Sequence, residues 1–281
     1  MMQNWLNDIW HRRFKQPYGL AKTYDRGTGP GIVLLHGIGR TGNVWKRVTE
    51  HLQSDVPQAR VIAFDLLGFG ASPKPDYLQY DVDDHAAAVI ASLRKSGIQT
   101  PIVLVGHSMG CLVAVRVARL RPDLVKYLVL YEMPLYEGLP TKWHYRTRIN
   151  AYFKLYDWIA RQNPTFDEAK SQVKLRLTRR VVGTDLNADS WQPYVKSLKN
   201  TIMKQSAATD LPLLTMPADI IYGTLDLLVI RGKVQQTLGL DSKLVTLHTI
   251  KERHVISEQA SAFIVECILR TMRPEVRLAE R

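Results

Sequence analysis

Short apolar runs recur along the chain and predict the strands of a buried β-sheet. Runs of four to seven residues rich in Val, Ile and Leu are typical of strands that are covered on both faces. The runs are residues 31–35, 61–64, 102–105, 125–131, 219–222 and 244–250. The pattern therefore predicts six strands.

Helical patterns lie between several of these runs. Apolar residues spaced three or four positions apart form one stripe on a helix, and that stripe packs on the sheet. One stripe ends at Gly97, and the last one starts after Ser257, a candidate cap, and stops near Pro274. The stripes consist of Val44, Val48 and Leu52; of Val82, Ala86, Val89, Ile90 and Leu93; and of Ala260, Phe263, Ile264, Cys267 and Ile268. Strands that alternate with helices predict an α/β fold with a mainly parallel sheet.

Residues 135–210 interrupt this alternation with helical-looking, aromatic and basic sequence. We expect a mostly helical cap insertion over one edge of the sheet. The domain prediction is therefore a core in two parts, residues 1–134 and 211–281, with the insertion between them. Its aromatic side chains form either a small core of their own or the lining of a pocket, and the pattern does not decide between the two.

The positive charge of the chain is concentrated in this insertion. The formal net charge is +12, and residues 141–180 hold ten Lys or Arg against three Asp or Glu. Such a surplus is compatible with an acidic substrate, an anionic membrane or nucleic acid, but a solvated face is the favoured interpretation. No nucleic-acid-binding motif accompanies the charge, so we do not expect nucleic acid as a partner.

Cofactor and metal motifs are weak in this sequence. The two cysteines, Cys111 and Cys267, sit in apolar helical patterns, where a buried free thiol is commoner than a disulfide or a metal ligand. Gly68 and Gly70 follow a strand, but position 73 is Pro, which argues against a dinucleotide-binding loop. We expect no cofactor and no metal.

The amino terminus lacks the apolar core of a secretory signal and no run reaches 18 apolar residues, so we expect a cytoplasmic protein without a transmembrane segment.

The most informative motif is Gly106-His107-Ser108-Met109-Gly110, which lies directly after a predicted strand and directly before a helical pattern. A G-x-S-x-G pattern alone is expected by chance on the order of once in ten chains of this length. A serine between a strand and a helix, however, occupies a sharp turn in which flanking glycines avoid a Cβ clash. This setting predicts that Ser108 is a nucleophile at the carboxyl end of the sheet.

An oxyanion site is expected beside Ser108. The backbone N–H of Met109 lies at the positive end of the following helix. A second donor is available in the glycine-rich segment His36-Gly37-Ile38-Gly39 after the first predicted strand, with Ile38 as the contributing N–H. We expect His36 and His107 to be hydrogen-bonded scaffold rather than catalytic bases.

A serine nucleophile needs a base and an acid that orients the base. His254 follows the last predicted strand and Asp226 follows the strand before it, so both would open on the same edge as Ser108. Glu132 ends the strand 125–131 and competes for the role of the acid. Asp226 is favoured, and Glu132 stays open as the alternative.

With these residues in the order Ser, Asp, His, the chain resembles the α/β-hydrolase family over residues 20–272, apart from the insertion. The segment from Asp65 to Ser72 is similar to a D-x-x-G-x-G-x-S turn that is common in this family. The resemblance implies a serine hydrolase that cleaves a carboxylic ester or a related acyl substrate, which is a small molecule. The basic and aromatic insertion leaves open whether that molecule is anionic or aromatic.

Two groups of alternatives stay open. Relatives with the same triad hydrolyse carbon–carbon bonds, lactones or amides, or transfer acyl groups. A member of another class would be a ligand-binding or regulatory protein that keeps the fold but turns over little. The sequence does not determine the oligomeric state.

Overall fold

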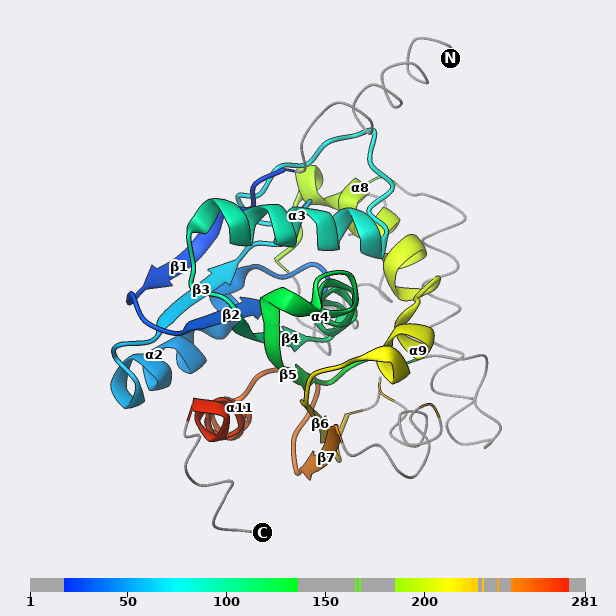
Figure 1. Ribbon diagram of the computed structural model, residues 1–281. Coiled ribbons are helices and arrows are strands. Elements are labelled where there is room, and N and C mark those ends of the chain that lie inside the picture. The colour runs from blue at the N-terminus through cyan, green and yellow to red at the C-terminus, as the bar shows by residue number, and fades with distance from the viewer. Residues whose placement is uncertain are drawn as a thin grey trace.

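A twisted β-sheet forms the centre of the described part of the chain (Figure 1). The computed structural model describes residues 18–135, 185–226 and 244–272, with the single positions 165, 167, 229 and 237. Within these ranges the sheet has seven strands in the order β1-β3-β2-β4-β5-β6-β7. They are β1 (Lys22–Arg26), β2 (Gly31–Leu35), β3 (Arg60–Phe64), β4 (Ile102–His107), β5 (Val125–Tyr131), β6 (Ala218–Gly223) and β7 (Val245–Ile250).

Six strands of this sheet run parallel, and only β1 is antiparallel, paired with β3. The six parallel strands are the six apolar runs of the sequence, so the predicted α/β fold is confirmed. Strand β1 was missed because its sequence, KTYDR, is mostly polar and its side chains are exposed or half-buried. An edge strand of this kind carries no apolar run, and its pairing depends on β3 as a neighbour.

Helices cover both faces of the sheet (Figure 1). Helices α3 (Val82–Ser96) and α4 (Met109–Leu120) lie on one face, and α2 (Lys46–Asp55) and α11 (Glu258–Met272) lie on the other. Alternate residues of each strand point to opposite faces. On β2, Val33 belongs to the core under α3 and α4, while Ile32 belongs to the core under α2 and α11.

The ends of the helices agree with the predicted signals. Gly97 ends α3 with a φ of 62°, a left-handed conformation that glycine adopts without strain. The Ser257 side chain accepts a hydrogen bond from the Ala260 N–H at 3.1 Å, and α11 ends at Met272, two residues before Pro274. Ser257 and Pro274 thus mark the start and the end of α11, the helix that follows the last strand.

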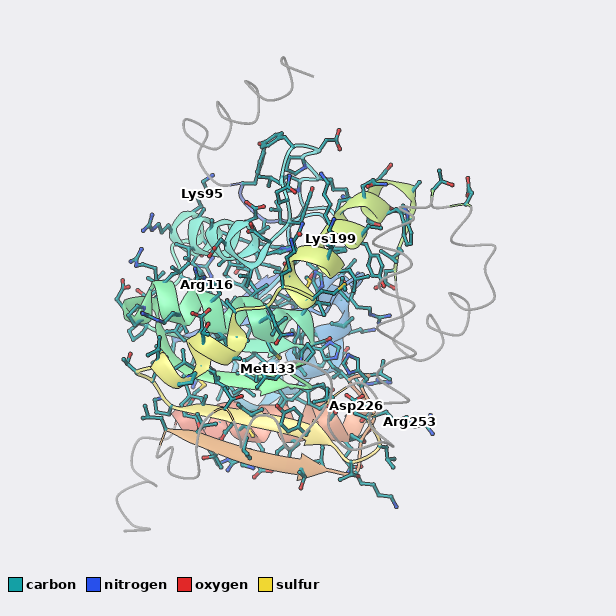
Figure 2. All side chains as sticks on the ribbon, turned by 90° about the vertical axis from the view of Figure 1, so that its right-hand side faces the viewer. Lys95, Arg116, Met133, Lys199, Asp226 and Arg253 are labelled. Atoms are coloured by element: carbon teal, nitrogen blue, oxygen red, sulfur yellow. The ribbon has the colours of Figure 1, made fainter. Side chains whose placement is uncertain are left out.

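The described part of the predicted insertion is helical. It contains α8 (Ala188–Ser197), the π-helical turn η3 (Leu198–Ile202) and α9 (Ala207–Asp210). Arg116 of α4, labelled in Figure 2, binds Asp210 of α9 at 3.1 Å. Residues 136–164 and most of 166–184 lie outside the described residues, so the cap domain with bounds 135–210 stays a prediction.

Both cysteines are buried and unbridged, as the sequence predicts. Burial raises the pKa of the Cys111 thiol, which therefore behaves as an apolar packing group. Among the described helices, none has the length and apolar character that crossing a membrane requires. The cytoplasmic location stays a prediction.

Candidate active site

Ser108 occupies the turn between β4 and α4. Its backbone has a φ of 52° and a ψ of −119°, a conformation that costs a residue with a side chain of order 1–3 kcal/mol. The Ser108 N–H donates to the carbonyl of Tyr131 at 3.0 Å, which fastens the turn to the end of β5. Ser108 is 6% exposed. Strain that is held in place by a neighbouring strand is typical of functional positions.

The two glycines of the motif let the strand and the helix meet. A Cβ on Gly106 would lie 2.7 Å from backbone atoms of Gly110 and Cys111. A Cβ on Gly110 would lie 2.3 Å from the carbonyl oxygen of Leu35 on β2. Both positions therefore exclude any side chain. This is the Cβ clash that the glycines of the motif are predicted to avoid.

Ser108, His254 and Asp226 lie in one hydrogen-bonded row. The Nε2 atom of His254 is 3.0 Å from the Ser108 Oγ, and its Nδ1 atom is 2.7 Å from Asp226 Oδ2. The side chains of His254 and Asp226 are 5% and 1% exposed. Figure 2 shows Asp226 and Arg253, the residue before His254, at the same end of the sheet. The structure thus brings together the three residues that the sequence singled out.

Glu132 lies beside this row but makes a different contact. Its Oε1 atom accepts a hydrogen bond from the Gly223 N–H at 2.6 Å, and the residue is fully buried. Asp226, not Glu132, is the carboxylate that contacts His254 Nδ1 at 2.7 Å. The geometry therefore favours Asp226 as the acid of the candidate site.

The two segments that carry the expected oxyanion donors meet at Ser108. Gly37 packs so closely on the turn that a Cβ there would meet Ser108 Cβ at 3.1 Å. Among the described residues, neither the Ile38 N–H nor the Met109 N–H donates to a protein acceptor. Within the described residues both amides therefore lack a protein acceptor, and their role as oxyanion donors stays a prediction.

His36 and His107 have structural contacts. His36 Nδ1 donates to the Gly37 carbonyl at 2.7 Å, and its Nε2 accepts from the Leu66 N–H at 2.8 Å. His107 Nε2 donates to the carbonyl of His254 at 2.8 Å. The first histidine joins the glycine-rich segment to the turn after β3, and the second holds the His254 loop. Both agree with the predicted scaffold role.

The turn from Asp65 to Ser72 is also structural. The Asp65 carboxylate accepts hydrogen bonds from the Gly42 and Ala71 N–H groups, each at 2.8 Å. The Ser72 Oγ donates to the Asp65 carbonyl at 2.5 Å. These bonds close the loop on itself and bring it against the start of the segment that precedes α2.

Tyr131 is a site residue that the sequence analysis missed. Its hydroxyl donates to the Arg253 carbonyl at 2.8 Å, and its own carbonyl accepts from the Ser108 N–H. Tyr131 therefore ties both the Ser108 turn and the His254 loop to β5. Its place at the end of an apolar strand gives no sign of this role, because the contacts come from segments far apart in the sequence.

A cavity of about 350 Å³ opens beside the His254 loop. It is lined by Arg40, Lys46, Arg47, His107 and Val255, among others, and Ser108 is not part of its lining. The cavity therefore lies next to the candidate site and does not contain the reacting hydroxyl.

Two clusters within the described ranges combine residue types that bind metals: Asp219, His248 and Cys267, and Glu132, Asp226 and His254. In each cluster the histidine already pairs with an aspartate, at 2.9 and 2.7 Å. Arg270 also donates to Cys267 Sγ at 3.1 Å, which disfavours a cation there. These contacts account for both clusters without a metal, and the expectation of no metal or cofactor stays a prediction.

Buried neutral histidines make the fold sensitive to acid. Burial lowers the pKa of His36 to about 4 and of His85 and His107 to about 3, against about 6.5 in an unfolded chain. Below pH 6.5 these histidines bind protons in the unfolded state but stay neutral in the folded state. Their contribution to stability is therefore complete above pH 6.5 and is lost as the pH falls toward 4 for His36 and toward 3 for His85 and His107.

We expect the His85→Gln variant to lose less stability than the wild type between pH 7 and pH 5, by about 2 kcal/mol. His85 suits this test because its ring contacts Ser197 Oγ at 3.1 Å and the Tyr80 ring, with centroids 6.1 Å apart, and neither residue belongs to the candidate triad. Urea unfolding at both pH values measures the difference. Between pH 7 and pH 8 the two proteins should change alike, and an equal loss at pH 5 would contradict the prediction.

Comparison with known proteins identifies the family. The alpha/beta hydrolase fold profile matches residues 30–238. The chain belongs to the alpha/beta hydrolase family. This agrees with the sheet order, the helices on both faces and the position of Ser108.

Several curated relatives of this alpha/beta hydrolase carry hydrolase names. It is 31% identical over 210 residues to the pimeloyl-[acyl-carrier protein] methyl ester esterase of Pseudoalteromonas atlantica, covering 71% of this chain and 70% of the relative. It is 36% identical over 106 residues to a probable lysophospholipase, BODYGUARD 4, of Arabidopsis thaliana, covering 37% of this chain and only 25% of the relative. These names support a hydrolytic enzyme of this fold.

Among solved structures, the enol-lactonase from Burkholderia xenovorans superposes on this alpha/beta hydrolase with a TM-score of 0.66. The sequences are 20% identical, and the alignment covers 89% of this chain and 95% of the lactonase. At this level of identity the likeness concerns the fold. The predicted fold class is thereby confirmed, and the family match together with the named hydrolase relatives confirms the predicted enzyme class.

Proposed function

We propose that this alpha/beta hydrolase cleaves a carboxylic ester, or a related acyl compound, through a Ser108–His254–Asp226 triad and an acyl-enzyme. The observation that carries the proposal is the pair of hydrogen bonds from Ser108 Oγ to His254 Nε2 and from His254 Nδ1 to Asp226 Oδ2, at 3.0 and 2.7 Å. The esterase and lipase names among the relatives support the same reaction class.

The geometry suits acyl transfer. Ser108 Oγ attacks the carbonyl carbon while His254 Nε2 takes the hydroxyl proton, and the buried Asp226 carboxylate stabilises the imidazolium that forms. The Ile38 and Met109 N–H groups donate to the developing oxyanion, with help from the positive end of α4. His254 then gives its proton to the leaving alcohol. A water molecule, activated by the same histidine, releases the acid from Ser108.

The described part of the insertion supports a cap beside this site. A Cβ on Gly39 would meet side-chain atoms of Leu186 and Tyr194 at 3.3 Å, so the segment before α8 and α8 itself pack on the glycine-rich loop. Trp191 and Tyr194 stack with ring centroids 5.5 Å apart. We infer that this described part of the insertion covers the acyl pocket, with Trp191 and Tyr194 as packed walls. An apolar or aromatic acyl group fits such walls.

Labelling with a fluorophosphonate tests the nucleophile. We expect wild-type protein to be labelled and the Ser108→Ala variant to show no label, because the probe reacts with an activated serine hydroxyl. The matched control is Ser54→Ala, which removes an exposed serine of α2 and should label like the wild type. An unlabelled but folded wild-type protein would overturn the proposal.

A series of nitrophenyl esters with increasing acyl length then tests the substrate class. We expect hydrolysis of the activated ester with a maximum at one chain length, which measures the depth of the acyl pocket. Labelling of Ser108 without turnover of any ester would reject ester hydrolysis. It would favour a carbon–carbon bond hydrolase, a lactonase or a ligand-binding member of the fold.

A further inference from the structure

The loop that carries His254 has little backbone support of its own. Residues 251–257 join β7 to α11 and belong to no helix or strand. Among the described residues, the backbone groups of residues 253–255 make no hydrogen bond to another backbone group. Val255, the residue after His254, is exposed. The position of the candidate base therefore depends on side chains that reach this loop from elsewhere in the fold.

Two buried side chains from the centre of the sheet hold the loop by its carbonyl groups. The Tyr131 hydroxyl donates to the Arg253 carbonyl at 2.8 Å and lies 3.4 Å from the Val255 carbonyl oxygen. His107 Nε2 donates to the carbonyl of His254 itself, at 2.8 Å. Three consecutive carbonyl oxygens, centred on the candidate base, thus lie at hydrogen-bonding distance from only two side chains.

The two donors also support each other. His107 ends β4 and Tyr131 ends β5, the two residues are paired in register, and their rings stack with centroids 5.6 Å apart. The edge of Trp45 packs against His107, with ring centroids 6.4 Å apart and planes at 89°. Because neighbouring strands and a buried indole fix both rings, each donor has one available direction, toward the loop.

Burial keeps both donors in the protonation state that this contact requires. It lowers the pKa of His107 to about 3, so the ring is neutral at pH 7, and its one proton is on Nε2 because a carbonyl can only accept. Burial also raises the pKa of Tyr131, so its hydroxyl keeps its proton. The His107 and His254 rings are 5.2 Å apart, and a neutral His107 places no positive charge against the imidazolium that forms on His254.

Tyr131 holds the nucleophile as well as the base. Its carbonyl oxygen accepts the Ser108 N–H at 3.0 Å and the Cys111 S–H at 3.2 Å, while its hydroxyl reaches the loop of His254. One residue therefore determines the relative position of Ser108 and His254. Their reacting atoms, Oγ and Nε2, are 3.0 Å apart.

On these contacts, and resting on the proposed function, we propose that Tyr131 and His107 are positioning residues that hold His254 Nε2 at the hydroxyl of Ser108. Without the Tyr131 hydroxyl, the Arg253 carbonyl loses its donor and the loop gains conformations in which His254 is out of line. A displacement of about 1 Å between reacting groups is enough to lower a rate by orders of magnitude. The proposal gives neither residue a contact with the substrate, so substrate binding should be preserved.

The Tyr131→Phe variant tests this role, because it keeps the stacked ring and the backbone carbonyl and removes only the hydroxyl. We expect kcat on a nitrophenyl ester to fall by about 10- to 100-fold, with KM within about two-fold of the wild type. His107→Phe removes the second donor, keeps an aromatic ring, and should show the same split between kcat and KM. A folded Tyr131→Phe protein with wild-type kcat would overturn the inference.

Tyr80→Phe is the matched control for loss of a buried hydroxyl. Tyr80 is 1% exposed, and its hydroxyl donates to the Pro75 carbonyl at 3.0 Å, outside the candidate site. Each variant loses one hydroxyl–carbonyl hydrogen bond, so we expect both melting temperatures to fall by a similar few degrees, about 2–6 °C. Only Tyr131→Phe should lose kcat. An equal loss of kcat in Tyr80→Phe would mean that the effect is general destabilisation, and the inference would be wrong.

A spectroscopic measurement tests the position of His254 without turnover. A histidine Nδ1 proton that is hydrogen-bonded to a buried carboxylate, here that of Asp226, gives a downfield proton resonance. We expect a sharp signal in the wild type and in Tyr80→Phe, and a broadened or missing signal in Tyr131→Phe, because a looser loop lets this proton exchange with water. An unchanged signal in Tyr131→Phe would contradict the inference. If the wild type neither reacts with fluorophosphonate nor hydrolyses any ester, the proposed function fails instead, whatever this resonance shows.

Discussion

Replacing His254 with alanine should lower kcat on an ester substrate by about four to six orders of magnitude. His254 contacts both Ser108 Oγ and Asp226 Oδ2, at 3.0 and 2.7 Å, so its loss removes the base and separates the acid from the nucleophile. Without a base, the serine hydroxyl is a poor nucleophile at neutral pH. Because the effect is on the transition state, we expect KM to change little. Steady-state kinetics with a nitrophenyl ester measure both quantities.

The matched control for this prediction is His51→Ala. His51 lies on α2, its side chain is 38% exposed and its contact is with Glu258 at 2.7 Å, so the control removes an imidazole outside the candidate site. We expect wild-type kcat in this variant. If His254→Ala kept more than a hundredth of the wild-type rate, His254 would not be the base, and the proposed triad would be wrong.

The Gly110→Ala substitution should lower the free energy of unfolding by about 3 kcal/mol or more. The new Cβ would lie 2.3 Å from the Leu35 carbonyl oxygen and 2.7 Å from that of His36. These are backbone atoms at the end of a central strand, and they cannot move without disturbing its pairing with β3 and β4. Urea unfolding measures the change, and we expect labelling of Ser108 by fluorophosphonate to fall as the turn is displaced.

Substitutions at two other glycines separate the cost of a steric clash from the cost of backbone strain. Gly19→Ala meets only the flexible side chain of Lys95, at 3.8 Å, and should change stability little. Gly97→Ala has open space around the new Cβ but a φ of 62°, so it should cost only about 1 kcal/mol of backbone strain. A Gly110→Ala protein no less stable than Gly97→Ala would show that α4 moves away from β2 easily.

The sequence predicted some elements of the fold and missed one. The periodicity of the sequence was sufficient to predict six buried strands and the helices between them, because each apolar run or stripe can be recognised without its partners. The same reasoning failed for β1, whose residues are polar and whose strand conformation depends on hydrogen bonds to β3.

In the candidate site, too, some residues could be found from the sequence and one could not. Ser108 could be found from the sequence because glycines on both sides of a serine, between a strand and a helix, have a local steric cause. His254 and Asp226 could be found because parallel strands end at one edge of the sheet. Tyr131 could not be found, since its contacts with Arg253 and Ser108 join residues more than 20 positions apart.

By itself the sequence determined the class of fold, the strand ends at which polar groups gather and the serine that is the candidate nucleophile. It left two acids, Glu132 and Asp226, because both follow a strand of the same sheet. Only the tertiary structure decided that Asp226 Oδ2 lies 2.7 Å from His254 Nδ1 while Glu132 Oε1 accepts from Gly223. The physical reason is that strand order and side-chain direction depend on pairing between distant segments, whereas turns and stripes depend on neighbouring residues.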